Sequence, residues 1–121
     1  MRHESLVRNG DFARAYNKGK NWVHPHIVVY KNKNRVGYTR VGITTSKKVG
    51  NAVQRNRARR VIRAALAEVL PANVGGFDFV FVARGQTPRL KSPQLAKTLR
   101  ALLQQAGVTV QPFPAAQGKD P

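Results

Sequence analysis

The strongest constraint on the fold is the run Phe77–Ala83, with the sequence FDFVFVA, which is apolar at every position except Asp78. A β-rich run without polar alternation predicts a strand that is buried on both faces or central in a sheet. Such a strand needs neighbouring strands at its edges and packing elements on its faces. A chain of 121 residues is long enough to supply them within one compact domain.

Turn and capping residues divide the rest of the chain into helices and strands. Asp11 is expected to cap a short helix that ends near Lys18, and Asn51 to cap a long helix over 52–70. Ser92 at the N-cap with Pro93 at the first helical position predicts a last helix, which Gly107 ends. The expected strands are 22–23, 26–30, 38–45 and 77–83.

This order of elements predicts an α+β fold in which helices pack against one mixed sheet. Because a helix connects strands 38–45 and 77–83, those two strands should be parallel, and general rules predict a right-handed crossover between them. We expect one domain over 1–110. The Pro-containing polar end, 111–121, is expected to be a disordered tail.

The charge of the chain indicates its partner. Lys and Arg number 22 against 5 acids, a formal net charge of +17. Nucleic acid is the first candidate, because binding to phosphates releases counterions. The alternatives are a merely soluble surface, for which a net charge of about 2–8 is sufficient, and an anionic membrane surface, which is disfavoured because the basic helix lacks the Trp/Phe/Leu face that interfacial helices usually show.

The compartment is expected to be the cytoplasm. The chain has no cysteine and therefore no disulfide. No apolar run approaches the roughly 18 residues that a membrane span needs. The first residues, MRHESLV, lack the apolar stretch of a signal peptide.

One segment concentrates the basic residues. Seven of the 17 residues from Lys47 to Arg63 are Lys or Arg, and none is acidic. At 100° per residue, an apolar arc of the helix faces the sheet and an arginine-rich arc faces away. Like charges at this spacing destabilise the free protein, and guanidinium groups bind phosphate oxygens in pairs. The segment therefore predicts an RNA contact, with an ordinary solvated helix face as the alternative.

The run Ser46–Arg57, SKKVGNAVQRNR, resembles the signature of the bacterial ribonuclease P protein family. The blocks that match the family in order and spacing are Asp11-Phe12, Tyr16, Lys18-Gly19-Lys20, Val28-Val29-Tyr30, Val41-Gly42-Ile43 and Asp78–Arg84. The resemblance covers roughly residues 7–107. It implies a two-layer α-β sandwich with the order α-β-β-β-α-β-α, a mixed four-stranded sheet and a left-handed βαβ crossover, against the general rule.

The resemblance also implies the function. In that family an RNA with bound Mg²⁺ hydrolyses the bond that joins the 5′ leader to the mature end of precursor tRNA. The protein subunit binds the catalytic RNA and the leader, carries no catalytic residue and binds no cofactor or metal by itself. It is expected to be a monomer that binds the RNA 1:1 and to be inactive alone.

Two groups of residues match the family's binding positions. The cleft that contacts the leader is implied to contain Phe12, Tyr16 and Tyr30. Spacing alone favours ordinary core packing for Phe12 and Tyr16. The basic segment that faces the catalytic RNA is implied to contain Lys47, Lys48, Asn51, Arg55, Asn56, Arg57, Arg59, Arg60 and Arg63.

The sequence offers little support for other chemistry. The five acids are scattered, and His24-Pro25-His26 without Cys or a nearby carboxylate is a weak metal motif. Gly75-Gly76 lacks the Lys-Ser/Thr of a phosphate-binding loop. Two other hypotheses stay open. The first is a ribosomal protein or RNA chaperone with a similar fold, and the second is a DNA-binding protein. The second is disfavoured because strands, not a second helix, flank the basic helix.

Overall fold

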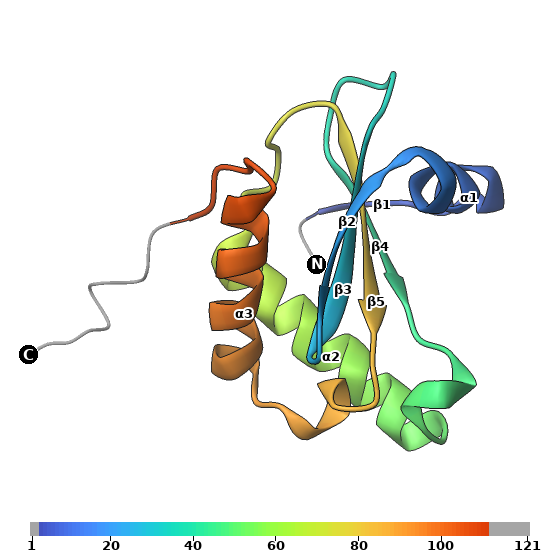
Figure 1. Cartoon of the computed structure of the whole chain (residues 1–121), viewed down its shortest axis with the longest axis vertical. Coiled ribbons are helices and arrows are strands. Elements are labelled where there is room, and N and C mark those ends of the chain that lie inside the picture. The colour runs from blue at the N-terminus through green and yellow to red at the C-terminus, as the bar shows by residue number, and fades with distance from the viewer. Residues whose placement is uncertain (1–2, 112–121) are drawn as a thin grey trace, which may run out of the picture.

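The computed structural model describes residues 3–111 as one mixed sheet with helices on its two faces (Figure 1). The strands are β1 Glu4–Ser5, β2 Lys20–His24, β3 Ile27–Lys33, β4 Arg40–Thr44 and β5 Phe77–Ala83. The helices are α1 Asn9–Lys18, α2 Ala52–Val69 and α3 Ser92–Gln105, with short 3₁₀ turns η1 Lys47–Val49 and η2 Thr87–Arg89.

The apolar run β5 lies at the centre of the sheet, as predicted. The strand order is β1-β4-β5-β3-β2, with β5 parallel to β4 and antiparallel to β3. Phe79, Val80 and Phe81 are fully buried, because both faces of this strand are covered. The α+β class and the parallel pair that encloses α2 are confirmed, whereas the handedness of that crossover stays a prediction.

The sheet has five strands where four were expected. The additional strand is β1, which pairs in parallel with β4 through Glu4↔Arg40 and Ser5↔Val41. A two-residue strand of polar side chains has no periodicity to detect, and it is defined only by its long-range backbone pairing.

The two faces of the sheet are covered differently. Helices α2 and α3 pack on one face around a large core that includes Ile62, Leu66, Leu99 and Phe79. Helix α1 crosses the opposite face alone, on the right in Figure 1. There a small buried cluster forms from Leu6, Ala15 and Val80. Because one helix cannot cover a whole sheet face, the second face remains partly open beside α1.

Two of the three predicted helix caps need correction. Helix α1 begins at Asn9, so Asp11 lies in its first turn, where it pairs with arginines instead of capping. Helix α3 begins at Ser92 itself, with Lys91 in the cap position. Its start lies one residue earlier because the Gln94 side chain accepts a hydrogen bond from the Lys91 amide. Asn51 caps α2 as predicted.

The two ends of the described chain meet at the C-terminal end of α2. The His3 ring nitrogen Nε2 lies 2.8 Å from the Leu70 carbonyl oxygen, and the Gln111 amide donates to the Val69 carbonyl at 2.8 Å. Gln111 is therefore anchored, whereas the rest of the tail predicted over 111–121 lies outside the described residues.

No helix within residues 3–111 is long and apolar enough to cross a membrane.

Candidate RNA-binding surfaces

The three aromatic residues predicted to form a cleft lie together on the open face of the sheet. The rings of Tyr16 and Tyr30 meet edge to face, with centroids 4.9 Å apart. Phe12 and Tyr30 both pack on the small cluster around Val80. The Tyr16 hydroxyl lies 2.9 Å from Thr44 Oγ1, which fixes the position of the ring. Phe12 and Tyr30 are half-buried and Tyr16 is exposed, so parts of their rings are available for stacking.

Gly42 allows this arrangement. A Cβ at this position would lie 2.6 Å from two ring carbons of Phe12, so the ring rests directly on the backbone of β4. The glycine therefore sets how deeply Phe12 sits and leaves the edge of the ring beside the open sheet. Spacing alone favoured a core role for Phe12 and Tyr16, and the structure gives Phe12 both a packed face and an accessible one.

The predicted basic segment begins with a well-ordered entry into α2. The 3₁₀ turn η1 presents the exposed Lys47 and Lys48. Gly50 follows with φ +142, a conformation that favours glycine. Asn51 and Gln54 then form a reciprocal capping box, with both hydrogen bonds at 3.0 Å. The side chain of Asn51 is thus engaged in holding the helix start, which positions the basic residues around it.

The outward face of α2 carries a cationic groove. It has a volume of about 460 Å³, and its lining combines three arginines with an amide and an apolar side chain. These residues are Val53, Asn56, Arg59, Arg60 and Arg63. No arginine of the basic segment pairs with a carboxylate within residues 3–111, whose ion pairs all involve Asp11 or Asp78. Val53, which is 73% exposed, was missed from sequence because a lone apolar residue among arginines carries no motif.

Two of the predicted arginines also bind the protein itself. Arg55 donates to the Gly50 carbonyl at 3.0 Å, which reinforces the start of α2. Arg57 donates from Nε to the Pro88 carbonyl in η2 at 2.6 Å. Arg57 therefore points toward η2, away from the groove, in agreement with its position at the edge of the basic arc. Its side chain lies beside Arg60 in a second depression between α2 and the start of α3.

A network of buried charges, which sequence reasoning missed, lies at the far end of the open face. Asp78 is 1% exposed and receives two hydrogen bonds of 2.8 Å from Arg40. Arg40 also lies 3.4 Å from Asp11, which in turn pairs with Arg14. The signal in the sequence was the single acid in an otherwise apolar strand, because a buried carboxylate needs a partner.

The described residues do not form a metal centre. Within residues 3–111, no group of three His, Cys, Asp or Glu side chains is arranged to hold an ion. The His24 and His26 rings lie 4.6 Å apart, but Nδ1 of His24 accepts the His26 backbone amide and Nδ1 of His26 lies 2.9 Å from Thr98 Oγ1. These hydrogen bonds leave only Nε2 of each ring as a possible metal ligand, and within residues 3–111 no third His, Cys, Asp or Glu side chain is placed to complete a site with the pair.

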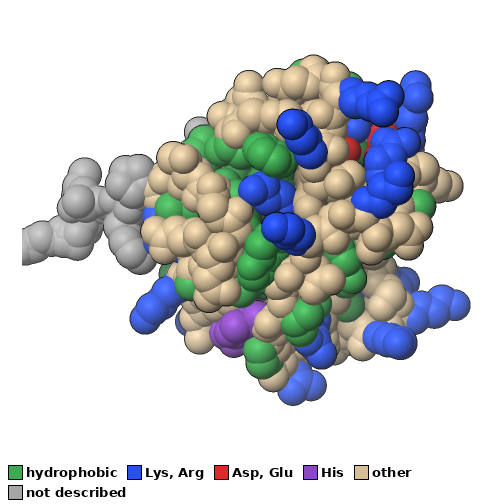
Figure 2. Space-filling view, turned by 45° about the horizontal axis from the view of Figure 1, so that its top comes forward, with side chains coloured by type: hydrophobic (Ala, Val, Ile, Leu, Met, Phe, Trp, Pro, Cys, Tyr) green, Lys and Arg blue, Asp and Glu red, His purple; other side chains and the backbone are tan. Residues whose placement is uncertain are grey.

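The surface is dominated by cations. On the face in Figure 2, Lys and Arg side chains are spread over the molecule, and the red of acidic side chains is confined to a small area among them. The whole chain has 5 acidic residues against 22 Lys and Arg, so carboxylates are scarce over its surface. Such a surface attracts a polyanion over a long range and makes binding depend on salt.

Comparison with known proteins identifies the family. The model of the ribonuclease P protein family matches residues 1–107. The ribonuclease P protein component of Clostridioides difficile is 34% identical over 110 residues, which cover 90% of this chain and 96% of the relative. That of Pelotomaculum thermopropionicum is 38% identical over 103 residues, covering 85% and 92%.

Solved structures agree with the sequence comparison. The ribonuclease P protein of Staphylococcus aureus superposes with a TM-score of 0.71 at 32% identity, covering 86% of this chain and 95% of that protein. The Thermotoga maritima protein gives a TM-score of 0.70 at 29% identity, covering 85% and 97%. With the fold, the motif and the relatives in agreement, the chain belongs to the bacterial ribonuclease P protein component family.

Proposed function

We propose that this protein binds two RNAs at once within ribonuclease P. The basic segment from Lys47 to Arg63 binds the catalytic RNA, and the aromatic cleft binds the single-stranded 5′ leader of precursor tRNA. The complex then removes the leader and releases the mature 5′ end. The observation that carries the proposal is the cluster of Phe12, Tyr16 and Tyr30, which lies partly exposed on an open sheet face.

The cleft suits a ligand of variable sequence. Base-on-aromatic stacking contributes about 1–3 kcal/mol per base and tolerates any base, because every base has a π-face. The side chains assigned to the cleft offer mainly aromatic rings, and the Tyr16 hydroxyl lies 2.9 Å from Thr44 Oγ1. Leaders differ between precursors, so a site that binds by stacking and charge serves them all.

The outward face of α2 suits a structured RNA. Its arginines have no carboxylate partners within the described residues, so their charges are free to bind phosphate. Guanidinium groups bind phosphate oxygens in pairs, and Asn56 adds an amide that can donate or accept. Because α2 lies on the sheet face opposite α1, a single protein can contact a catalytic RNA and a leader without overlap.

The proposed chemistry belongs to the RNA. Hydrolysis of a phosphodiester with Mg²⁺ requires ligands for the ion, and RNA phosphates supply them. The protein raises substrate affinity and positions the leader, as one protein per catalytic RNA in the cytoplasm. Alone it is expected to cleave nothing.

The experiment that tests this function is a cleavage assay with a bacterial ribonuclease P RNA and labelled precursor tRNA. At low Mg²⁺, where the RNA alone is nearly inactive, wild-type protein should restore cleavage at the mature 5′ end. Arg63→Gln should weaken that effect, whereas Lys97→Gln, which removes one exposed charge from α3, should not. Binding of RNA without restored cleavage would instead favour a ribosomal protein or RNA chaperone.

A further inference from the structure

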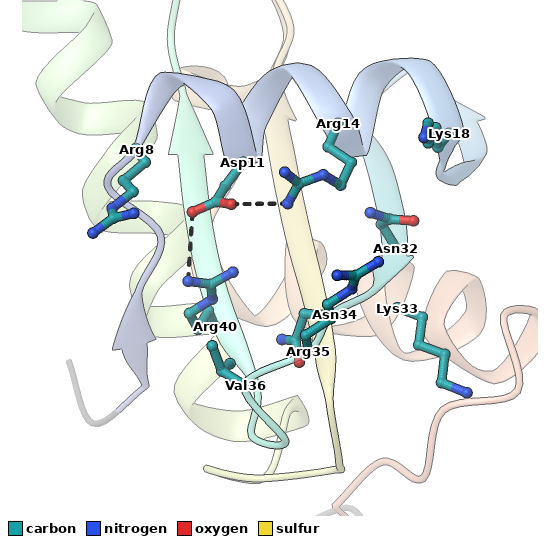
Figure 3. Close-up of a pocket in the computed structure, with 10 residues that line it drawn as sticks. All are labelled: Arg8, Asp11, Arg14, Lys18, Asn32, Lys33, Asn34, Arg35, Val36 and Arg40. Carbon is teal, nitrogen blue, oxygen red and sulfur yellow. Dashed lines mark hydrogen bonds and ion pairs between the residues drawn. The ribbon is translucent and has the colours of Figure 1, made fainter.

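A second cationic site lies on the opposite flank of α1 from the aromatic cleft. It is a pocket of about 650 Å³ between α1 and the hairpin that joins β3 to β4 (Figure 3). Six cationic side chains line it, from α1 and the residue before it, from the end of β3 and its hairpin, and from the start of β4: Arg8, Arg14, Lys18, Lys33, Arg35 and Arg40. Asp11, which is largely buried, is its sole acidic lining residue.

The charges of the pocket are only partly compensated. Asp11 pairs with Arg14 at 3.2 Å and with Arg40 at 3.4 Å, as the dashed lines in Figure 3 show. Asp78 also binds Arg40. The remaining four lining cations, Arg8, Lys18, Lys33 and Arg35, have no ion pair within residues 3–111. The floor is therefore close to neutral and the rim is strongly positive.

The hairpin side of the pocket is fixed in place before any ligand binds. The Asn34 amide nitrogen donates to Asp78 at 2.8 Å and to the Tyr38 carbonyl at 2.9 Å. The Asn34 side-chain oxygen accepts the Gly37 amide, and the Asn34 backbone amide donates to Gly76 at 2.8 Å. A preformed loop lowers the entropy cost of binding, which favours a binding site over a merely solvated loop.

From this geometry we infer that the pocket binds phosphate groups of the leader, upstream of the nucleotides in the aromatic cleft. The inference rests on the proposed function of that cleft. Tyr30 and Asn32 lie two positions apart on one face of β3, a distance of roughly 7 Å. Tyr30 belongs to the cleft and Asn32 lines the pocket. Gly19, the residue after α1, lies directly against Lys31 and Asn32 of β3, so an RNA strand that stacks on Tyr16 and Tyr30 must pass over the outside of the last turn of α1, at Lys18, to reach the pocket with its next nucleotides.

The position of the pocket favours the leader over the catalytic RNA. The pocket and the cleft share the sheet face that α1 crosses, whereas α2 lies on the opposite face. The mixed lining of guanidinium and ammonium groups, with no aromatic ring, suits backbone phosphates and not bases. This surface extends the protein's footprint on the substrate without adding sequence preference.

The test uses the reconstituted holoenzyme and two precursor tRNAs. One has a leader just long enough to fill the aromatic cleft, and the other extends it by several nucleotides in the 5′ direction. Wild-type holoenzyme should bind the longer leader more tightly and with a steeper salt dependence, by about 0.7 in log–log slope for each added single-strand phosphate contact. Arg35→Glu should weaken binding of the long-leader precursor roughly tenfold and leave the short-leader precursor unchanged.

The matched control is Lys97→Glu, which makes the same charge change at an exposed position on α3. Lys33→Gln gives a second variant at another exposed rim residue, in case Arg35→Glu disturbs the hairpin. Equal affinity of Arg35→Glu and Lys97→Glu for the long leader would overturn the inference. So would a loss confined to binding of the catalytic RNA. A Phe12→Ala variant that binds the short leader normally would instead refute the proposed role of the cleft, so the two failures are distinguishable.

Discussion

Arg40 and Asp78 face each other in register across the parallel strands β4 and β5, and their side chains form a two-pronged ion pair. Nε of Arg40 lies 2.8 Å from Oδ1 of Asp78, and Nη2 lies 2.8 Å from Oδ2. The hydrogen bond with Asp78 raises the pKa of Arg40 above its ordinary value, more than burial lowers it. This pair lets a carboxylate occupy the central strand, and it connects the sheet to α1 through Asp11.

Replacing Arg40 with alanine should destabilise the protein strongly. The substitution leaves the carboxylate of Asp78 buried with a single amide donor from Asn34. Breaking a buried pair by removing one partner costs about 3–5 kcal/mol. Urea denaturation should therefore give a free energy of unfolding lower by about 3 kcal/mol.

The control for this prediction is Arg14→Ala. Arg14 pairs with Asp11 from a side chain that is 55% exposed, and exposed pairs contribute about 0–1 kcal/mol. If both variants lose less than about 1 kcal/mol, the Arg40–Asp78 pair is not a major source of stability.

Stability should fall on mild acidification through His24. Burial, and after it the charge of His26, lowers the pKa of His24. The unfolded chain then takes up a proton more readily than the folded protein. The contribution of neutral His24 to the free energy of unfolding is fully present above the ordinary histidine pKa of 6.5. It is lost as the pH falls from 6.5 toward the lowered pKa that His24 has in the folded protein.

The measurement is the thermal unfolding midpoint as a function of pH, from about 8 to about 5. His24→Asn should flatten the profile, because an asparagine oxygen can still accept the His26 amide without titrating. An unchanged slope in this variant would assign the acid sensitivity to another group.

The sequence predicts the central elements because their signals are local. The apolar run of β5 and the capped, periodic helix α2 need no knowledge of distant residues. The same holds for the basic arc, since helical geometry alone separates its arginines from the buried Ala58 and Ile62.

The features that sequence reasoning missed depend on long-range geometry. Strand β1 exists only through its pairing with β4. The cationic pocket forms only when the hairpin loop folds over Asp78. The hydrogen bond from the Asn34 side chain to Asp78, which holds the loop there, joins residues 44 positions apart. The contact of Arg57 with Pro88 likewise joins segments 31 residues apart. No residue pattern within one segment carries such information.

The start of α2 should be sensitive to loss of its cap. Asn51→Ala removes the acceptor for the Gln54 amide, and loss of an N-cap costs about 1 kcal/mol. Asn51→Ser should retain most of the stability, since serine caps nearly as well. Urea denaturation measures the free energy of unfolding of both variants, which should be lower for Asn51→Ala than for Asn51→Ser. An equal decrease in the two variants would mean that the side-chain cap contributes little.

Gly42→Ala should impair leader binding more than stability. The added Cβ would lie 2.6 Å from the Phe12 ring, and because that ring is only half-buried it can swing outward. Overpacking of this kind costs about 1–3 kcal/mol, so the variant should remain folded. The displaced ring would leave the place where a base stacks, so holoenzyme affinity for precursor tRNA should fall severalfold while affinity for mature tRNA stays constant. Gly85→Ala, at an exposed site with no atom within 4 Å of the new Cβ, is the matched control. If Gly42→Ala and Gly85→Ala both bind precursor tRNA as tightly as wild type, then the contact of the Phe12 ring with β4 does not determine the affinity of the cleft for the leader.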